Sequence, residues 1–517
     1  MFKNRYKFLI ITALIQTVVI AAMVYFVNDG FNTNFLLVFL ASLLCIDLTF
    51  LFKNKAIRII NFLLLGIFIF QLINYTFTAD YIVTETLFNL PSYNEVETSF
   101  IIKAVSGLIF CFLIWLPNIL FPVFENNKRN ICLAILLIVI SILLPSVSNL
   151  KEPILEIYTI LSSKTFFDLE MAKEFERDKI STGFSLIEGR GCNVILIFAE
   201  GTSRQVIKPD VTPNTYELLG KSFCVDNYFC HTAPTYRGVR GQLISGYQQN
   251  GIYIADRIAM NPKLSTIPML HTILAKEGYK TCFVSPHLID DPFNSMIDQL
   301  SFQKVVVNKN PSELQSDRDT YDALFKAADE YEKAKEKYLI CTYIQGTHVY
   351  LDSPHEKYKD GKDACLNKFY NQDHWFGEFV KKMQMNNYLD NTLLVFTADH
   401  STYPTPDFDK AFQSKHTSFV DTVPLLIYKN GITPQHFDAQ NKNSLALTPT
   451  ILNILGIENH RNYFLGNSLF SEEKSPYQNL SVRESYIIDT SSGKVKPVLY
   501  PSEQLYKKIR TYYKLFG

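Results

Sequence analysis

The sequence predicts a protein of two parts: an N-terminal bundle of five transmembrane helices and a C-terminal α/β domain whose mostly parallel sheet has helices on both faces. The 517 residues include 50 basic and 50 acidic side chains, but only 16 of these charges lie within the first 150 residues. That first part consists mainly of long apolar runs, whereas the rest alternates short apolar runs with helical stretches. The two parts are therefore suited to different solvents.

Five apolar runs in the first part are long enough, or nearly so, to cross a bilayer, for which about 20 helical residues suffice. These runs cover residues 8–27, 35–52, 59–77, 104–124 and 130–146. A cleaved signal peptide would have one shorter run. The repetition therefore predicts a permanent polytopic anchor over residues 1–146.

The charges between the runs predict the orientation of the anchor. Basic residues precede the first run and follow the second and fourth, namely Lys3, Arg5, Lys7, Lys53, Lys55, Arg58, Lys128 and Arg129. The alternate loops, 28–34 and 78–99, contain no lysine or arginine. Because basic loops stay in the cytoplasm, we expect a cytoplasmic N-terminus. An odd number of spans then places the rest of the chain outside the cytoplasm.

We expect a linker over residues 147–190 and a catalytic domain over residues 191–517. The linker mixes apolar and charged residues, which predicts amphipathic helices lying at the membrane surface. A plain helical linker is the alternative. Six cysteines lie in the exported part, where oxidation favours disulfides, and the short connection between Cys224 and Cys230 makes them the first candidate pair. Buried free thiols are the alternative there.

The balanced charge and the lack of certain motifs disfavour two classes of function, namely nucleic-acid binding and nucleotide binding. The balanced charge provides no field for nucleic acid. The chain also lacks a Walker loop, a GxGxxG pattern and a CxxC pattern, so nucleotide binding has no support.

Polar side chains follow two of the predicted strands. The short apolar runs are 193–198, 280–284, 338–343, 392–396 and 424–428. Glu200 follows the first run, and Asp399-His400 follows the fourth. Because the carboxyl ends of parallel strands share one edge of a sheet, these side chains can meet there and bind Zn²⁺, with Mn²⁺ as the other candidate. The alternatives are that Glu200 caps a helix and that Asp399-His400 forms an ordinary turn.

Further candidate residues come from three other segments. His348 follows the third run, and His416 lies in the loop after Asp399-His400. Thr235 opens an apolar helix, where a metal and the helix N-terminus would activate its hydroxyl as a nucleophile. Thr232 and Thr202 are competing hydroxyls. On the same helix, Arg237 and Arg240 would either bind phosphate oxygens or form surface ion pairs.

These motifs together resemble the sulfatase-like branch of the alkaline phosphatase superfamily. The resemblance rests on Glu200, the threonine about 35 residues later, Gly346-Thr347-His348, Asp399-His400, Val423-Pro-Leu-Leu-Ile-Tyr428 and Leu447-Thr-Pro-Thr-Ile-Leu-Asn-Ile-Leu-Gly456. Five spans followed by an external domain are similar to the phosphoethanolamine transferases and lipoteichoic acid synthases of that branch.

The resemblance implies the roles of individual residues. It implies metal ligands at Glu200, Asp399 and His400, and a nucleophile that also contacts the metal at Thr235. His348 would bind the substrate or a second metal. True sulfatases mature a cysteine or serine within Cys-x-Pro-x-Arg to formylglycine, and Pro234-Thr-Tyr-Arg-Gly-Val-Arg240 offers neither residue there. Formylglycine chemistry is thereby disfavoured.

The resemblance also implies a function. We expect a phosphotransferase of the bacterial inner membrane, with its catalytic domain periplasmic or extracellular. It would move phosphoethanolamine, ranked slightly above glycerol phosphate, from a phospholipid to a surface glycan or glycolipid through a phosphothreonine, with His348 and His416 assisting. The loops around Glu200 and Thr235 depart from both transferase types, so the motifs do not identify the head group. The alternatives are a sulfatase-like hydrolase and a non-catalytic glycan-binding relic.

Overall fold

The computed structural model describes residues 33–78, 82, 116, 120, 122, 124–150, 154, 173–248, 267–287, 292–307, 316–349, 351–414, 418–483, 486–498 and 501–516. The chain divides into two compact units, Met1–Ser162 with Pro404–Asp409, and Ser163–Tyr403 with Lys410–Gly517. His416 and the predicted spans 8–27 and, apart from a few residues, 104–124 lie outside the described part.

The described helices are α2 (Thr33–Phe50), α3 (Lys55–Thr78), α6 (Lys128–Leu143), α7 (Pro145–Ser148), α10 (Pro213–Leu219), α11 (Thr235–Ile244), α13 (Leu270–Lys276), α14 (Pro292–Gln299), α15 (Asp317–Ala334), α16 (Ala364–Met385), α17 (Pro406–Phe412), α18 (Leu447–Ile454) and α19 (Glu503–Phe516). The strands are β1 (Asn193–Ala199), β2 (Phe223–Asp226), β3 (Lys280–Val284), β4 (Lys304–Val306), β5 (Tyr338–Ile344), β6 (Thr392–Ala398), β7 (Leu425–Tyr428), β8 (Gln435–Asp438), β9 (Leu480–Arg483), β10 (Tyr486–Asp489) and β11 (Lys496–Pro497). The short 3₁₀ helices of the described part are η2 (Arg204–Val206), η6 (Tyr388–Asp390) and η7 (Ser444–Ala446).

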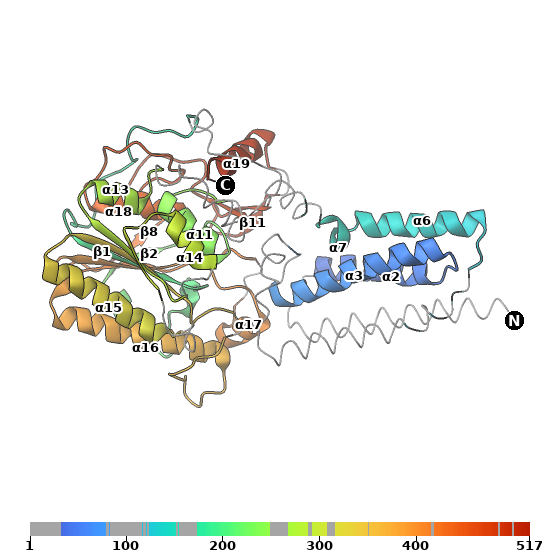
Figure 1. Ribbon diagram of the computed structural model, residues 1–517, viewed down its shortest axis with the longest axis horizontal. Coiled ribbons are helices and arrows are strands. Elements are labelled where there is room, and N and C mark those ends of the chain that lie inside the picture. Colours follow the sequence, from blue (N-terminus) through green and yellow to red (C-terminus); the bar gives the residue numbers. More distant parts are fainter. Residues whose placement is uncertain are drawn as a thin grey trace. The chain divides into compact units, whose positions relative to one another are not determined.

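In the first unit, α2, α3 and α6 pack against one another (Figure 1). They cover most of the predicted runs 35–52, 59–77 and 130–146. Their interface buries apolar side chains such as Phe39 and Phe68, and it also buries polar ones such as Asp47 and Asn61. None of the described helices meets the length and apolarity needed to cross a membrane.

The second unit is built on an eight-stranded sheet of order β4-β3-β5-β1-β6-β7-β2-β8. The five strands from β4 to β6 run parallel to one another, while β7 pairs antiparallel with both β6 and β2. Every residue of β1, β5 and β6 is buried, as expected for parallel strands that are covered on both faces. The predicted mostly parallel α/β domain is therefore confirmed. A smaller antiparallel sheet, β11-β10-β9, was not anticipated.

Helices cover both faces of the large sheet (Figure 1). One apolar cluster includes side chains of α11, α13, α18 and α19, and the other includes side chains of α15 and α16. The central strand β1 contributes alternate residues to the two clusters, with Val194 on one face and Ile195 on the other. The carboxyl ends of β5, β1 and β6 thus lie side by side at one edge of a rigid sheet.

The candidate disulfide between Cys224 and Cys230 is wrong, because both residues are buried thiols without a disulfide. The two side chains belong to different cores: Cys224 packs with the α15 and α16 cluster, and Cys230 packs with the α11 cluster. The thiol of Cys230 donates a hydrogen bond to the Phe419 carbonyl at 3.5 Å. The short sequence separation did not reveal that the two residues occupy opposite faces of the sheet.

Residues 173–190, the described end of the predicted helical linker, contain no helix. This segment runs along the second unit, where Arg177 forms a β-bridge with Asn462 and the Ile180 amide donates to the Glu458 carbonyl at 2.9 Å. Phe175 and Ile187 are buried in the main apolar cluster. Burial of these spaced apolar residues favours an extended path over a helix at this point.

Candidate active site

Glu200 is the first residue after the central strand β1, and the backbone around it is held on both sides. Its amide donates to the Ile344 carbonyl at the end of β5, and its own carbonyl accepts from the Thr347 hydroxyl at 2.5 Å. Glu200 does not cap a helix, since the next helical turn, η2, has Ser203 at its N-cap position. The carboxylate therefore projects from a strand end that neighbouring segments fix in place.

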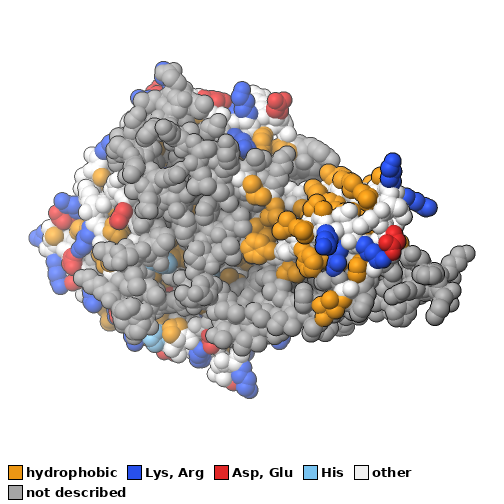
Figure 2. Space-filling model, turned by 45° about the vertical axis from the view of Figure 1, so that its right-hand side comes forward, with side chains coloured by type: hydrophobic (Ala, Val, Ile, Leu, Met, Phe, Trp, Pro, Cys, Tyr) orange, Lys and Arg blue, Asp and Glu red, His pale blue; other side chains and the backbone are white. Residues whose placement is uncertain are grey.

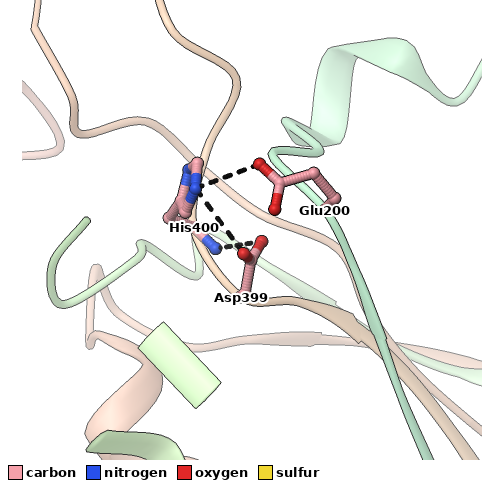
Figure 3. Close-up of side chains that lie close together, drawn as sticks. All are labelled: Glu200, Asp399 and His400. Carbon is pink, nitrogen blue, oxygen red and sulfur yellow. Dashed lines mark hydrogen bonds and ion pairs between the residues drawn. The ribbon is translucent and has the colours of Figure 1, made fainter. Parts of the chain in front are cut away.

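Asp399 and His400 follow β6 and lie beside Glu200 (Figure 3). The Nε2 atom of His400 is 3.3 Å from Glu200 Oε1 and 3.5 Å from Asp399 Oδ2. Asp399 Oδ1 accepts hydrogen bonds from the amides of Gly201 and His400 at 2.8 and 2.7 Å. Gly201 has a φ of +48°, a conformation that glycine adopts without strain, and this turn directs its amide toward Asp399.

The histidine tautomer is determined by its neighbour. His400 Nδ1 lies 2.7 Å from the Ser401 carbonyl oxygen, which can only accept a hydrogen bond. Nδ1 therefore carries a proton, and Nε2 is the ring nitrogen that faces the two carboxylates and is available to a metal. A hydrogen bond of this kind to the far ring nitrogen is typical of metal-binding histidines.

These three residues fit a divalent cation. Each offers one ligand atom, these atoms lie within 4.8 Å of one another, and all three side chains are buried. Asp399 Oδ2 accepts no hydrogen bond although it is buried, and an unsatisfied buried carboxylate oxygen is costly without a compensating charge. Two carboxylates and one imidazole, with further positions open, suit a catalytic metal site.

The ionisation of the cluster is strongly coupled. Burial, reinforced by the charge of Glu200, raises the pKa of Asp399 above its usual value. Burial would lower the pKa of His400, but Asp399 and Glu200 raise it to about 9. Burial alone would raise the pKa of Glu200, yet His400 and the hydrogen bonds to this carboxylate bring it below the usual value. Without a cation the site retains protons, so binding a metal would release them.

Among the three candidate hydroxyls, Thr235 is the one that contacts the carboxylate. Its Oγ1 donates to Glu200 Oε2 at 2.6 Å. Thr232 instead donates to the Val482 carbonyl at 2.6 Å, and Thr202 donates to the Glu200 backbone carbonyl at 2.9 Å. Thr235 is also the first residue of α11, at the helix end whose free amides favour negative charge.

Helix α11 packs unusually close to the end of β6. A Cβ atom on Gly238 would lie 2.2 Å from the Asp399 carbonyl oxygen, so only glycine fits there. From the next turn, Gln242 Nε2 donates to the carbonyls of Ala398 and Asp399 at 2.9 and 3.2 Å. These contacts hold the helix that carries Thr235 against the strand that carries Asp399.

Arg237 and Arg240 are buried, which rules out the surface ion pairs considered as an alternative. Arg237 Nε donates to the Tyr236 hydroxyl at 2.9 Å. Burial lowers the pKa of Arg240 to about 10, so this guanidinium group keeps its charge near neutral pH. Both buried guanidinium groups belong to the helix that Thr235 begins, and such groups are suited to binding an anion.

His348 lies near the cluster but outside the three-residue group. Its imidazole is one of the groups that lower the pKa of Glu200, and its Nδ1 lies 3.1 Å from the Val349 carbonyl. The Lys368 ammonium on α16 donates to the His348 carbonyl at 3.2 Å. Asp317 accepts the Gly346 amide at 2.9 Å and so supports the same loop from α15.

Tyr343 is a site residue that the sequence did not single out. Its hydroxyl donates to Glu200 Oε2 from the carboxyl-terminal end of β5. Burial raises the pKa of Tyr343 well above its usual value, so the phenol remains a donor. The sequence signal for Tyr343 was a tyrosine in an apolar strand, five residues before His348, and that pattern is equally typical of a core residue.

Solved structures that share this fold include two proteins that cover about two thirds of this chain. A protein of the alkaline phosphatase superfamily from Vibrio parahaemolyticus is 16% identical, with a TM-score of 0.53, over 69% of this chain and 93% of that one. The lipoteichoic acid synthase LtaP from Listeria monocytogenes is 17% identical, with a TM-score of 0.51, over 67% of this chain and 96% of that one. The second unit therefore has the alkaline phosphatase superfamily fold.

The sulfatase family model matches residues 192–457, half of the chain, and the protein belongs to the sulfatase family. The matched segment begins just before β1 and includes Glu200, Thr235, Asp399 and His400. The superfamily consists of metal-dependent enzymes, among them sulfatases and phosphotransferases.

The first prediction concerns the metal cluster. Glu200→Gln keeps the shape of the side chain but removes a charged ligand, so we expect metal affinity to fall by more than about a hundredfold, beyond the usual effect of losing a supporting hydrogen bond. Chelator competition on the full-length protein measures this. Glu217→Gln is the control, because Glu217 is an exposed partner of Lys221. Equal affinity in Glu200→Gln and the wild type would contradict the assignment.

The second prediction concerns the loop that carries His348. Burial raises the pKa of Asp317 to about 7, whereas an aspartate in an unfolded chain has a pKa of about 3.9. The folded state therefore holds this proton more tightly, so its contribution to the free energy of unfolding is full below about pH 4 and is lost as the pH rises toward about 7. Between these pH values we expect the wild type to lose on the order of a few kcal/mol of its free energy of unfolding through this group. Asp317→Asn should lack this loss.

Denaturant titrations in a Trp115→Phe background would measure this loss, because Trp375 then remains as the single tryptophan. Its indole donates to Asn371, whose amide in turn donates to Asp317. If the free energy of unfolding depends on pH in the same way in the wild type and in Asp317→Asn, the prediction is refuted.

Proposed function

We propose that this protein is a membrane-anchored phosphotransferase that moves phosphoethanolamine or glycerol phosphate from a phospholipid to a hydroxyl of a surface glycan or glycolipid. The observation that carries the proposal is the 2.6 Å hydrogen bond from Thr235 Oγ1 to Glu200 Oε2 within a buried cluster of candidate metal ligands. A hydroxyl held in this way is suited to covalent catalysis.

Glu200, Asp399 and His400 would hold the metal, and Thr235 would complete its coordination. We favour zinc for this mixed carboxylate and imidazole set, with manganese as the alternative. The bound ion would lower the pKa of the Thr235 hydroxyl and withdraw charge from the phosphate.

In the first half-reaction, the Thr235 oxygen forms a bond to phosphorus, and the bond from phosphorus to the diacylglycerol oxygen breaks. Diacylglycerol leaves with a proton, and a phosphothreonine diester remains. In the second half-reaction, the acceptor hydroxyl attacks phosphorus, and the Thr235 oxygen leaves and regains a proton. Arg237 and Arg240 would neutralise the phosphate charge, and His348, together with His416, would move the protons.

A hydrolase is the second candidate, because the family model bears the name of the sulfatases. In that case water would replace the acceptor alcohol in the second half-reaction. Thr235 stands where formylglycine-dependent sulfatases need a cysteine or serine, which favours phosphate over sulfate chemistry. The fate of the transferred group distinguishes transfer from hydrolysis.

The first unit supports the proposed anchor in a bacterial inner membrane. Large apolar side chains face outward from α3 and α6, among them Ile59, Leu63, Leu136 and Leu143. Figure 2 shows hydrophobic side chains gathered in one area, with lysine and arginine side chains at its margin. The same helices bury Asp47 and Asn61. Polar side chains between helices and apolar side chains facing outward are typical of helices in a bilayer.

The third prediction tests the nucleophile. Full-length protein in bilayers of phosphatidylethanolamine or phosphatidylglycerol, with zinc and no acceptor, should acquire one head-group phosphate on Thr235, which peptide mass spectrometry detects. Thr235→Ala should lack the adduct and lose at least about a thousandfold in transfer rate. Thr232→Ala is the matched control, because that hydroxyl faces the Val482 carbonyl.

The mass of the adduct identifies the donor. Release of the free head group at the same rate with and without a glycan acceptor would favour the hydrolase. Absence of any adduct despite bound metal would count against the covalent mechanism.

The fourth prediction tests the anchor. Five spans place the two ends of the chain on opposite sides of the membrane, so a C-terminal tag should be digested by protease added to spheroplasts and an N-terminal tag should be protected. The protein should also stay in the pellet after alkaline carbonate extraction. Extraction into the supernatant, or both tags on one side, would contradict the topology.

A further inference from the structure

Tyr343 donates its hydroxyl proton to Glu200 Oε2, the same oxygen that accepts from Thr235. We propose that Tyr343 is a positioning residue that orients the Glu200 carboxylate for metal binding and places it beside the nucleophile. The role in positioning the nucleophile rests on the proposed function, whereas the role in metal binding stands without it.

The two oxygens of Glu200 have separate roles. Oε2 accepts from two hydroxyl groups, while Oε1 faces His400 Nε2 at 3.3 Å. A glutamate carboxylate rotates over a broad range about its last bond unless its partners fix it. With both donors on Oε2, the carboxylate plane is set and Oε1 is directed into the ligand cluster.

The position of the Tyr343 hydroxyl is itself fixed by rigid structure. Tyr343 pairs in register with Phe198 of β1, two residues before Glu200. Its buried ring stacks on Phe293 at a centroid distance of 5.0 Å, and it lies parallel to the His287 ring at 6.0 Å. The donor therefore approaches Glu200 from a central strand and an aromatic stack, which hold it more precisely than a loop would.

Tyr343 also supplies a donor that persists through the reaction. When Thr235 becomes bonded to phosphorus it can no longer donate to Oε2. The Tyr343 hydroxyl then remains as the donor to that oxygen, so the carboxylate keeps its orientation in both half-reactions. Supporting hydrogen bonds of this kind typically account for 10- to 100-fold in metal affinity or activity, as an order of magnitude.

The fifth prediction compares two tyrosines of the same strand in the full-length protein. Tyr343→Phe should weaken zinc binding by about 10- to 100-fold in chelator competition and lower kcat for transfer with little change in KM. Tyr338→Phe is the matched control, because Tyr338 is equally buried on β5 but bonds to Glu332 at 2.9 Å and to Thr392 at 3.1 Å, away from the cluster. Its zinc affinity should remain that of the wild type.

Zinc affinity within twofold of the wild type in Tyr343→Phe would overturn the proposal. So would an equal loss in Tyr338→Phe, or a fall in the metal-free unfolding temperature of Tyr343→Phe well beyond that of Tyr338→Phe, since either result would mean a general structural role. If the wild type forms no Thr235 adduct but Tyr343→Phe still weakens zinc binding selectively, then the transfer mechanism fails and the positioning role stands.

Discussion

A carboxylate buried at the end of the central strand must be compensated, because an isolated buried charge is very costly. Glu200 meets this requirement through hydroxyl donors on one oxygen and His400 on the other. The neighbouring Asp399 carboxylate is compensated less completely, because its Oδ2 atom accepts no hydrogen bond. This unsatisfied oxygen fits a bound cation, and under the proposed function that cation would activate Thr235.

The sheet and helix α11 explain how this cluster of buried charged side chains is held in place. Strands β5, β1 and β6 are adjacent, parallel and fully buried, so their carboxyl ends deliver side chains to one edge with little freedom. Helix α11 approaches this edge closely because Gly238 leaves room for the Asp399 carbonyl and Gln242 bonds to it. Thr235 and the three candidate ligands thus belong to one packed body built on strands and a helix.

The elements that sequence reasoning located correctly are those governed by a simple period or by sheet topology. Continuous apolar runs predicted β1 and β6, and the rule that parallel strands end at one edge brought Glu200 together with Asp399 and His400. The family resemblance then pointed to Thr235 among several hydroxyls. All of these inferences use information that is local in the chain or general to α/β sheets.

The inferences that failed or were missed depend on which face a residue occupies. Cys224 and Cys230 are near in sequence but pack on opposite sides of the sheet. Tyr343 lies in a predicted apolar strand and its ring is buried, but its hydroxyl reaches the site. The linker end, 173–190, was predicted to be helical from its amphipathic pattern, yet contacts with residues 458–462 keep it extended. Such tertiary contacts leave no periodic signal in the sequence.

The central claim is that one cation, three protein ligands and the Thr235 hydroxyl meet at a single point. Anomalous diffraction at the zinc edge from crystals of the zinc-loaded full-length protein tests it most directly. The account predicts one peak with Glu200, Asp399 Oδ2 and His400 Nε2 at about 2.0–2.2 Å and Thr235 Oγ1 in the coordination sphere. Zinc bound elsewhere, or bound by the three ligands with Thr235 turned away, would contradict it.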